Sequence, residues 1–394
     1  MQISSKYTSY IMTNNNNDNI NYKASNHQPY FTKAVHKLDI FAAIIPFYWL
    51  RQWFKRRFFS MSSSPSCQGE RVNDGFYYLE APRFHNGFLY CSDMHDCKVY
   101  KIDPESGEIL LSIPFTDKVS GLGWLSSGEL LVVSMEASRI LIYNEETREC
   151  QSYADLAHVS KFRCNDMVVD VDDCIYVGNF GFDFDHLISA KTTTLVCISP
   201  NDKNREVSVA TTDMFFPNGS VITPDGNTLI VAETFRGQLT AFDITRTPIT
   251  DSDTATTNNK DDGNKLMLTN RRIWANVGLP LDGICLDAEG CVWAAVPKIG
   301  IYQTSGCVLR IAEDGKILEC LGFSCNGLSA MCVAVNLYTD GNGQSWLYVM
   351  ESKTIIEKKI MTKYKSQNSW ITKIPVSVGP AKREDCSRYN AGMC

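Results

Sequence analysis

The chain repeats one pattern about six times: an alternating apolar run, a turn rich in Gly, Asp and Asn, and a second alternating run. In one unit, residues 220–222 precede the turn and residues 229–231 follow it. Alternation of this kind is typical of β-strands, and long helical periodicity is absent. Strand units that repeat every ~40–50 residues predict a β-propeller. The predicted fold class is therefore all-β, a six-bladed β-propeller with four-stranded blades.

The units differ in length and leave the closure of the ring open. They begin near Pro82, Gly121, Asn165, Asn218, Asp282 and Met331. The longest interval contains residues 250–265, which are rich in Asp, Thr and Asn and which we expect to form a surface loop. A closed ring needs a strand from one terminus to complete the blade of the other. Residues 75–79 and 371–375 are candidates, and the pattern does not tell which segment supplies which strand.

The first part of the chain differs in composition from the rest. It contains an Asn-rich tract at residues 14–17 and an apolar stretch at residues 40–50, which is followed by a basic cluster. This stretch is shorter than the ~20 residues that span a bilayer, so we expect no stable membrane span. The order of the apolar and basic parts is the reverse of that in a signal peptide. We expect residues 1–67 to be an extension outside the fold, residues 68–380 to be the propeller, and residues 381–394 to be a tail.

Three interpretations of residues 1–60 stay open: an organellar targeting segment, an interfacial amphipathic anchor, or a translated extension ahead of a working start at Met61. We favour the last one, or cleavage, because Met61 directly precedes the first globular pattern. The fifteen cysteines are scattered without a Cys-x-x-Cys pair. Such usage favours buried free thiols over a disulfide framework, and hence a cytoplasmic location.

Charge argues against a nucleic acid as partner. The formal net charge is −6, but residues 1–60 carry a local charge of +6, which leaves −12 for the remainder. Nucleic-acid binding depends on clustered Lys and Arg that displace counterions. An acidic body accommodates a small, uncharged or oxygen-rich ligand more easily.

Four acidic or amide side chains share a position near the start of their units: Glu80, Asn165, Asn218 and Asp282. Glu80 stands seven residues before Gly87, and the others stand eight before Asp173, Gly226 and Gly290. Asn165, Asn218 and Asp282 each belong to an Asn-Asp, Asn-Gly or Asp-Gly pair, which commonly forms a turn, and the shared register of the four residues is what indicates a common role. Equivalent positions in a radial repeat face one axis. The sequence therefore predicts an axial site for a hard cation and an oxygen-rich substrate.

The motifs around these positions resemble the senescence-marker-protein, gluconolactonase and luciferin-regenerating-enzyme family. The resemblance covers about residues 75 to 355, and it is carried by residues 80–84, 165–170, 178–181, 216–219, 223–226, 232–234 and 282–290. It implies a six-bladed propeller with one divalent metal near the axis. It also implies an enzyme that hydrolyses lactones, or a close relative of one.

The resemblance assigns roles to individual residues. Glu80, Asn218 and Asp282 match the metal ligands of the family, Asn165 matches a residue that contacts the substrate or the metal and its water, and Arg163 matches a substrate-binding arginine. Oxygen ligands favour Ca²⁺, with Mg²⁺, Mn²⁺ or Zn²⁺ as alternatives. The implied activity is hydrolysis of a small lactone, as in the conversion of a sugar lactone to an aldonic acid, with Asp282 or Glu80 accepting a proton.

Some positions depart from the family pattern, and other functions stay open. Ala81 stands where the family usually has glycine, Phe84 where it has tryptophan, and residues 334–336 replace a double glycine. One alternative function is a calcium-binding propeller without catalysis, because a fold does not fix a function. Another is an alkaloid-condensing enzyme of the strictosidine-synthase type. The oligomeric state is not determined by the sequence.

Overall fold

The computed structural model describes residues 69–183, 191–199, 205, 207–248, 264–297, 306–322, 331–353 and 367–382. All these ranges lie in one compact unit, residues 44–394, and their regular elements are twenty-four strands. No helix in them is long and apolar enough to cross a membrane. The expected N-terminal extension and most of the expected tail lie outside the described residues.

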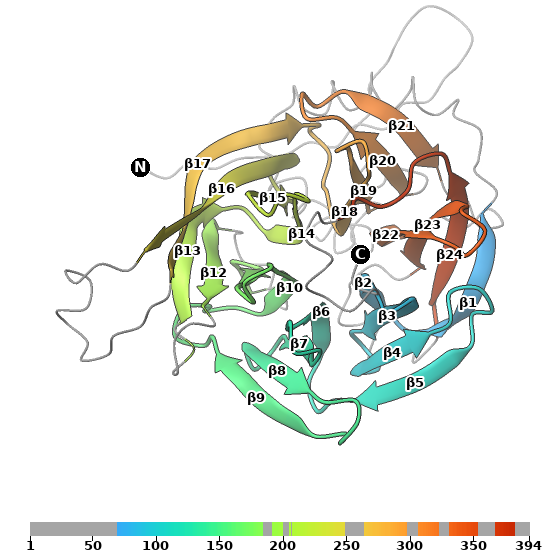
Figure 1. Ribbon diagram of the computed structural model, residues 1–394, viewed down its shortest axis with the longest axis horizontal. Coiled ribbons are helices and arrows are strands. Elements are labelled where there is room, and N and C mark those ends of the chain that lie inside the picture. Colours follow the sequence, from blue (N-terminus) through green and yellow to red (C-terminus); the bar gives the residue numbers. More distant parts are fainter. Residues whose placement is uncertain are drawn as a thin grey trace, which may run out of the picture. The chain divides into compact units, whose positions relative to one another are not determined.

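The strands form six antiparallel four-stranded sheets, numbered here as blades in chain order and arranged around one axis (Figure 1). Blade 1 comprises β2 (Leu79–His85), β3 (Phe88–Asp93), β4 (Lys98–Ile102) and β5 (Ile109–Pro114). Blade 2 comprises β6 (Val119–Trp124), β7 (Leu130–Ser134), β8 (Arg139–Tyr143) and β9 (Cys150–Asp155). Blade 3 comprises β10 (Cys164–Val169), β11 (Ile175–Asn179), β12 (Thr193–Ile198) and β13 (Val207–Met214).

The remaining blades follow the same order from the axis outward. Blade 4 comprises β14 (Pro217–Ile222), β15 (Thr228–Glu233), β16 (Gln238–Pro248) and β17 (Asn264–Asn276). Blade 5 comprises β18 (Ile284–Leu286), β19 (Val292–Val296), β20 (Cys307–Ile311) and β21 (Ile317–Gly322). Blade 6 comprises β22 (Met331–Thr339), β23 (Ser345–Ser352), β24 (Ser369–Val376) and, on its outer edge, β1 (Glu70–Phe76).

The ring is therefore closed by the N-terminal strand. β1 pairs with β24 from Glu70 opposite Lys373 to Phe76 opposite Ser369. Both proposed closing segments take part: residues 371–375 lie in β24, and residues 75–79 run from the end of β1 to the start of β2. The prediction of six four-stranded blades is confirmed, and the direction of closure is supplied by the structure.

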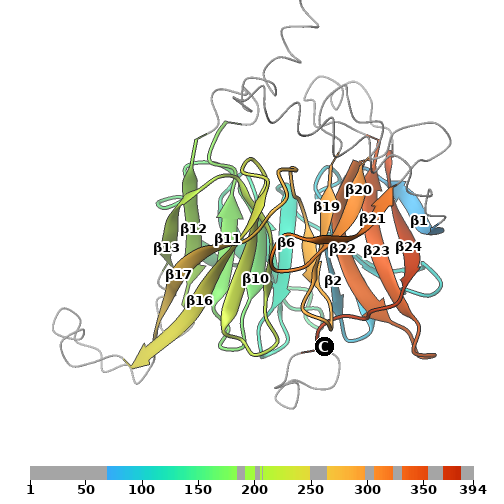
Figure 2. The same ribbon diagram turned by 90° about the horizontal axis from the view of Figure 1, so that it is seen from above.

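Burial follows the distance from the axis. All five residues of β19 are buried, including the fully enclosed Trp293. The outer strand β5 buries Ile113 alone and exposes residues such as Leu110. Inner strands pack against neighbouring blades on both faces, whereas outer strands have one face in solvent, so the exposed positions concentrate in the outer strands. Figure 2 shows the ring from the side, with strands running along the axis.

Candidate active site on the propeller axis

The inner strands of blades 1, 2, 3, 4 and 6 each have a shift in pairing register close to their first residue. The pairing register shifts by a residue after Glu80, Val119, Cys164 and Pro217, and again after Cys332. A β-bulge of this kind bends the strand and redirects a side chain, and such bulges gather beside active sites. In these five blades the inner strand therefore turns a residue near its start away from the regular pleat, whereas in blade 5 β18 pairs without a shift and Asp282 precedes it.

Close packing places these positions in one ring. A Cβ added to Gly121 would lie 2.5 Å from the Met167 nitrogen, and one added to Gly219 would lie 2.5 Å from the Ile284 nitrogen. Gly283 is packed equally closely against blade 6. Neighbouring inner strands therefore touch one residue beyond each ring position. The ring residues, in blade order, are Glu80, Ser120, Asn165, Asn218, Asp282 and Cys332, and all are more than nine-tenths buried.

The structure thus brings together the four residues that the sequence predicted for the axis and adds two more. Ser120 stands eight residues before Gly128, and Cys332 stands eight before Asp340. The same spacing rule would have found both. The sequence prediction does not include them, because it rests on acidic and amide side chains and these two carry a hydroxyl and a thiol.

The carboxyl groups of the ring share a region of low polarity. Burial raises the pKa of Glu80 well above its ordinary value, and the charges of Asp282 and Asp166 raise it further. Burial also raises the pKa of Asp282 to about 8, against a hydrogen bond from Asn218 and with a smaller contribution from Asp166. Buried carboxyl groups that repel each other are frustrated without a cation between them.

An ion pair connects blades 1 and 3 next to the ring. Arg83 donates to the Asp166 carboxylate at 2.8 Å and to the Met167 carbonyl at 2.9 Å. The Asp166 side chain is 6% exposed and that of Arg83 is 19% exposed. Because Asp166 is held by Arg83, we treat it as a supporting residue and not as a free ligand.

The amide residues differ in how they are held. Asn218 donates to the Thr234 hydroxyl at 3.2 Å, and Thr234 donates to the Leu281 carbonyl at 2.7 Å, beside Asp282. Asn165 is 3% exposed, and its Nδ2 has no hydrogen-bond partner among the described residues. Asn218 is therefore fixed against the acidic part of the ring, whereas Asn165 retains a donor for a ligand.

The departure at Ala81 has a backbone consequence. Ala81 directly follows Glu80 and has a φ of 45°, in the left-handed region that favours glycine. A non-glycine residue in this region is strained, and such strain is typical of functional sites. Phe84 stacks on Tyr338 with ring centroids 4.6 Å apart, so it forms part of the contact between blades 1 and 6.

Arg163 lies at the rim of the site, two residues before Asn165. It donates to Glu136 at 2.9 Å, and Lys118 donates to the same carboxylate oxygen at 2.9 Å. Burial lowers the pKa of the nearby His95 to about 4, and the charges of Lys118 and Arg163 lower it further. The rim over blades 1 to 3 therefore carries two cations, one carboxylate and a neutral histidine.

Phenylalanine side chains line the rim between blades 3 and 4. Phe180 lies 4.7 Å from Phe216, and Phe235 lies 4.9 Å from Phe216 and 5.4 Å from Phe182, measured between ring centroids. Phe216 precedes Asn218 by two residues, and it is only half-buried. This cluster gives the site an apolar wall across the axis from Glu80 of blade 1.

The ring can bind a divalent cation only if amide oxygens add to the two carboxyl groups as ligands. Within the described ranges, no three His, Cys, Asp or Glu side chains are grouped so that they could hold a metal ion. Glu80 and Asp282 supply two carboxyl groups, and Asn218 and Asn165 can add amide oxygens. Two hard anionic ligands with neutral oxygen ligands fit Ca²⁺ or Mg²⁺ chemistry. The buried carboxyl pair, whose pKa values are both raised, is the observation that supports this fit.

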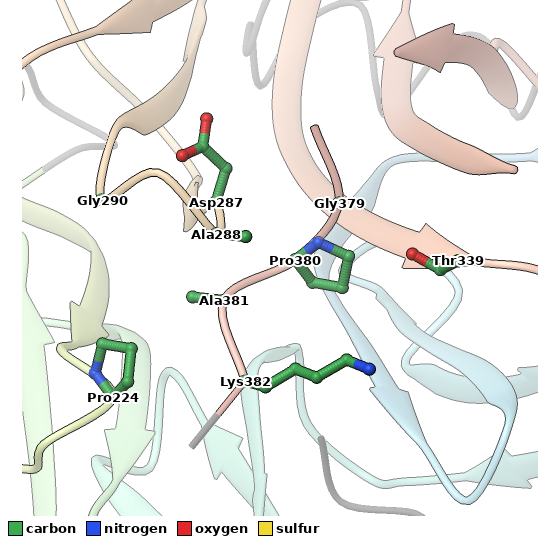
Figure 3. A pocket seen from close by; sticks show the side chains of 9 residues that line it. All are labelled: Pro224, Asp287, Ala288, Gly290, Thr339, Gly379, Pro380, Ala381 and Lys382. Atoms are coloured by element: carbon green, nitrogen blue, oxygen red, sulfur yellow. The ribbon is translucent and has the colours of Figure 1, made fainter. Parts of the chain in front are cut away.

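A cavity of about 540 Å³ lies at the other end of the inner strands. It is bordered by the turns at Pro224 and Gly290 and by the segment that ends at Lys382 (Figure 3). This segment is held to blade 5, because the Ala288 nitrogen donates to the Gly379 carbonyl at 2.9 Å. The cavity contains none of the ring residues, so we do not assign the chemistry to it.

Residues 79–349 match the family model described as the SMP-30/gluconolactonase/LRE-like region. The chain belongs to this family. The match includes every residue of the axial ring and therefore agrees with the resemblance found from the sequence motifs.

Solved structures of the SMP-30/gluconolactonase/LRE-like type share the fold at low sequence identity. A luciferin-regenerating enzyme aligns with a TM-score of 0.61 and 15% identity over 80% of this chain and 99% of its own. A calcium-binding regucalcin from Agrobacterium tumefaciens aligns with a TM-score of 0.58 and 15% identity over 81% of this chain and 96% of its own. A gluconolactonase from Xanthomonas campestris aligns with a TM-score of 0.53 and 18% identity over 78% of this chain and 89% of its own. No curated protein sequence matches the chain.

Proposed function

We propose that the axial ring is the active site of a metal-dependent hydrolase that opens a small lactone, as a gluconolactonase does. The observation that carries the proposal is the pair of buried carboxyl groups, Glu80 and Asp282, beside two amides: burial raises the pKa of both groups, and the charge of Asp282 raises that of Glu80 further. Family membership supports a lactonase-type activity. A sugar lactone that gives an aldonic acid is the substrate class we favour.

In this proposal, Glu80, Asn218, Asp282 and Asn165 hold one divalent cation, with Ca²⁺ favoured and Mg²⁺, Mn²⁺ or Zn²⁺ as alternatives. When bound, the cation supplies Lewis acidity toward the carbonyl and lowers the pKa of water. Asp282, or Glu80, takes a proton from the attacking water oxygen. The bond between the carbonyl carbon and the ring oxygen then breaks, and the ring oxygen leaves as a hydroxyl group after it receives a proton.

The rim residues orient the substrate. Arg163 is half-buried and paired with Glu136, so its guanidinium group is held at the rim, where it can face a substrate hydroxyl. The half-buried phenylalanines between blades 3 and 4 suit the apolar face of a lactone ring. The substrate is then held between a polar rim and an apolar one.

The first test is hydrolysis of a panel of sugar and aliphatic lactones by protein stripped with a chelator and then supplied with one cation at a time. We expect turnover to vanish with the chelator and to return with one of Ca²⁺, Mg²⁺, Mn²⁺ or Zn²⁺. A folded protein that hydrolyses no lactone with any cation would contradict the proposal.

A variant links the activity to the ring. Asp282→Ala should lower kcat by at least about 10²-fold without unfolding the protein, because it removes both a cation ligand and a proton acceptor. Asp314→Ala, at an exposed turn of the same blade, is the matched control and should keep full activity. Equal activity of the two variants would remove Asp282 from the mechanism.

A calcium-binding module without catalysis is the second candidate. Its support is the structural neighbour described as a calcium-binding protein. It predicts that Ca²⁺ raises the melting temperature while no lactone is hydrolysed. No described feature favours the strictosidine-synthase type. A cytoplasmic location remains a proposal from cysteine usage, in keeping with the eleven free cysteines of the described ranges.

A further inference from the structure

Two of the ring residues carry buried polar atoms that have no hydrogen-bond partner in the described part of the chain. Five such side-chain atoms occur among the described residues, and two of them are Ser120 Oγ and Asn165 Nδ2. Ser120 is fully buried and Asn165 is 3% exposed. Buried polar atoms in native proteins are almost always paired, so an unpaired one requires an explanation. Two unpaired atoms on consecutive ring positions point to a shared partner outside the chain.

The two residues are neighbours across a tight contact between blades. Gly121, next to Ser120, is packed against the backbone of Asp166 and Met167, next to Asn165. Both residues lie within the register shift of their strands, so both side chains depart from the regular strand alternation at equivalent positions along the axis. Their side chains therefore occupy adjacent positions on the axis.

The pair is neutral and can donate. An amide nitrogen donates only, and a serine hydroxyl can donate one hydrogen bond. The acidic ring positions belong to blades 1 and 5, and in a ring of six, blade 2 faces blade 5. Ser120 consequently lies across the axis from Asp282 and next to the ring position of Glu80, and its hydroxyl makes no hydrogen bond to either carboxyl group.

We propose that Ser120 and Asn165 together bind the carbonyl oxygen of the substrate, an inference that rests on the proposed hydrolase function. When the water oxygen adds to the carbonyl carbon, the π-electron pair moves to the carbonyl oxygen, which becomes an oxyanion. The Ser120 hydroxyl and the Asn165 amide donate to this oxygen, and their hydrogen bonds strengthen as its charge develops. Collapse of the adduct restores the carbonyl and expels the ring oxygen, so neither residue gains or loses a proton.

The test compares Ser120→Ala with Tyr176→Phe. Tyr176 also has a buried hydroxyl without a partner, but it lies in the core between blades 3 and 4, away from the axis. We expect Ser120→Ala to lower kcat by about 10²-fold, the usual effect of losing one oxyanion donor. Its melting temperature should stay the same or rise, since an unsatisfied buried hydroxyl is removed. Tyr176→Phe should keep kcat.

Loss of activity that parallels loss of stability would overturn the proposal, as would equal kcat values for the two variants. Binding provides a readout that does not depend on turnover. Gluconate, an open-chain acid with a carboxylate oxygen for the same donors, should bind Ser120→Ala about tenfold more weakly than wild type by calorimetry, a loss of about one hydrogen bond.

The two readouts separate the proposals. Lactone turnover that Ser120→Ala leaves intact refutes the role of Ser120 and retains the hydrolase. Gluconate binding that depends on Ser120, in a protein without lactone turnover, refutes the hydrolase and retains the donor pair. Absence of both turnover and Ser120-dependent binding refutes both.

Discussion

At the scale of single residues, the chemistry of this protein follows from where its carboxyl groups are buried. Glu80 and Asp282 are each 8% exposed, and burial is the first cause of the rise in both pKa values. A carboxyl group in such a place either keeps its proton or finds a positive partner. Arg83 supplies such a partner to Asp166, next to the ring, which leaves the ring pair itself available for a cation.

The raised pKa of Asp282 predicts how the stability of the metal-free protein depends on pH. The group ionises near pH 8 in the folded state and near 3.8 in the unfolded state. As pH rises between these values, the unfolded state loses its proton first, so the free energy of unfolding falls, by a few kcal/mol, since one pKa unit is worth about 1.4 kcal/mol. Denaturant titrations of metal-stripped protein at pH 5 and pH 8 measure this difference.

The matched variants are Asp282→Asn and Asp314→Asn. The first cannot ionise at residue 282, so its stability should differ less between the two pH values, and the rest of the slope comes from Glu80. The second should behave like the wild type. An unchanged slope in Asp282→Asn would show that Asp282 is ionised across this range.

At the scale of strands, the site depends on bulges and on small residues beside them. The ring residues of blades 1, 2, 3, 4 and 6 lie at a register shift, and the residue that follows must fit against the next blade. Glycine meets this need at Gly121, Gly219 and Gly283, because no Cβ occupies the contact. Ala81 meets it in blade 1 with a positive φ instead. The bulge and the small residue after it therefore position the ring side chains and allow neighbouring blades to pack closely.

Substitution at Gly121 tests this device. In Gly121→Ala the new Cβ would lie 2.5 Å from the Met167 nitrogen, and backbone atoms cannot move aside without separating blades 2 and 3. We expect the free energy of unfolding to fall by about 1–3 kcal/mol, as for other overpacked sites. Gly322→Ala is the control, because nothing lies within 4 Å of its Cβ position. Thermal unfolding that fails to separate the two variants would contradict the packing argument.

At the scale of the whole molecule, closure by β1 makes the ring a single unit. β1 covers the outer edge of β24, and Arg71 lies over the Trp370 ring at 4.5 Å from its centroid. Phe76, at the end of β1, is 2% exposed. Because β2 opens blade 1 directly after β1 completes blade 6, the chain ties its first and last blades together. All six ring residues depend on this closure, since the axis exists only in a complete circle.

Removal of β1 should therefore unfold or strongly destabilise the whole propeller. A chain that starts at Tyr77 leaves the edge of β24 unpaired, and we expect its melting temperature to drop by more than about 10 °C or its cooperative transition to disappear. A chain that starts at Gly69 is the control. A peptide of residues 69–76 should restore part of the stability when added to the shorter chain. Equal melting temperatures of the two chains would show that closure does not depend on β1.

Much of this arrangement could be predicted from the sequence because the signals are local. The alternation within residues 220–222 and 229–231 set the strands, and the repeated turn spacing set the number of blades and four of the ring residues. The same spacing also marked Ser120 and Cys332, although only a rule blind to residue type would have selected them. Family motifs supplied the expected roles of Glu80 and Asp282, which remain predictions until the variants are measured.

The sequence by itself determined the blades and the level of the ring, because strand alternation and turns depend on neighbouring residues. Only the tertiary structure decided which strand closes the circle, that Arg83 crosses to Asp166, and that the Asn165 amide lacks a partner. These are contacts between residues of different blades, and their partners depend on how the blades pack. Burial has the same origin, so the proton affinity of Asp282 is a property of the assembled ring and not of any local motif.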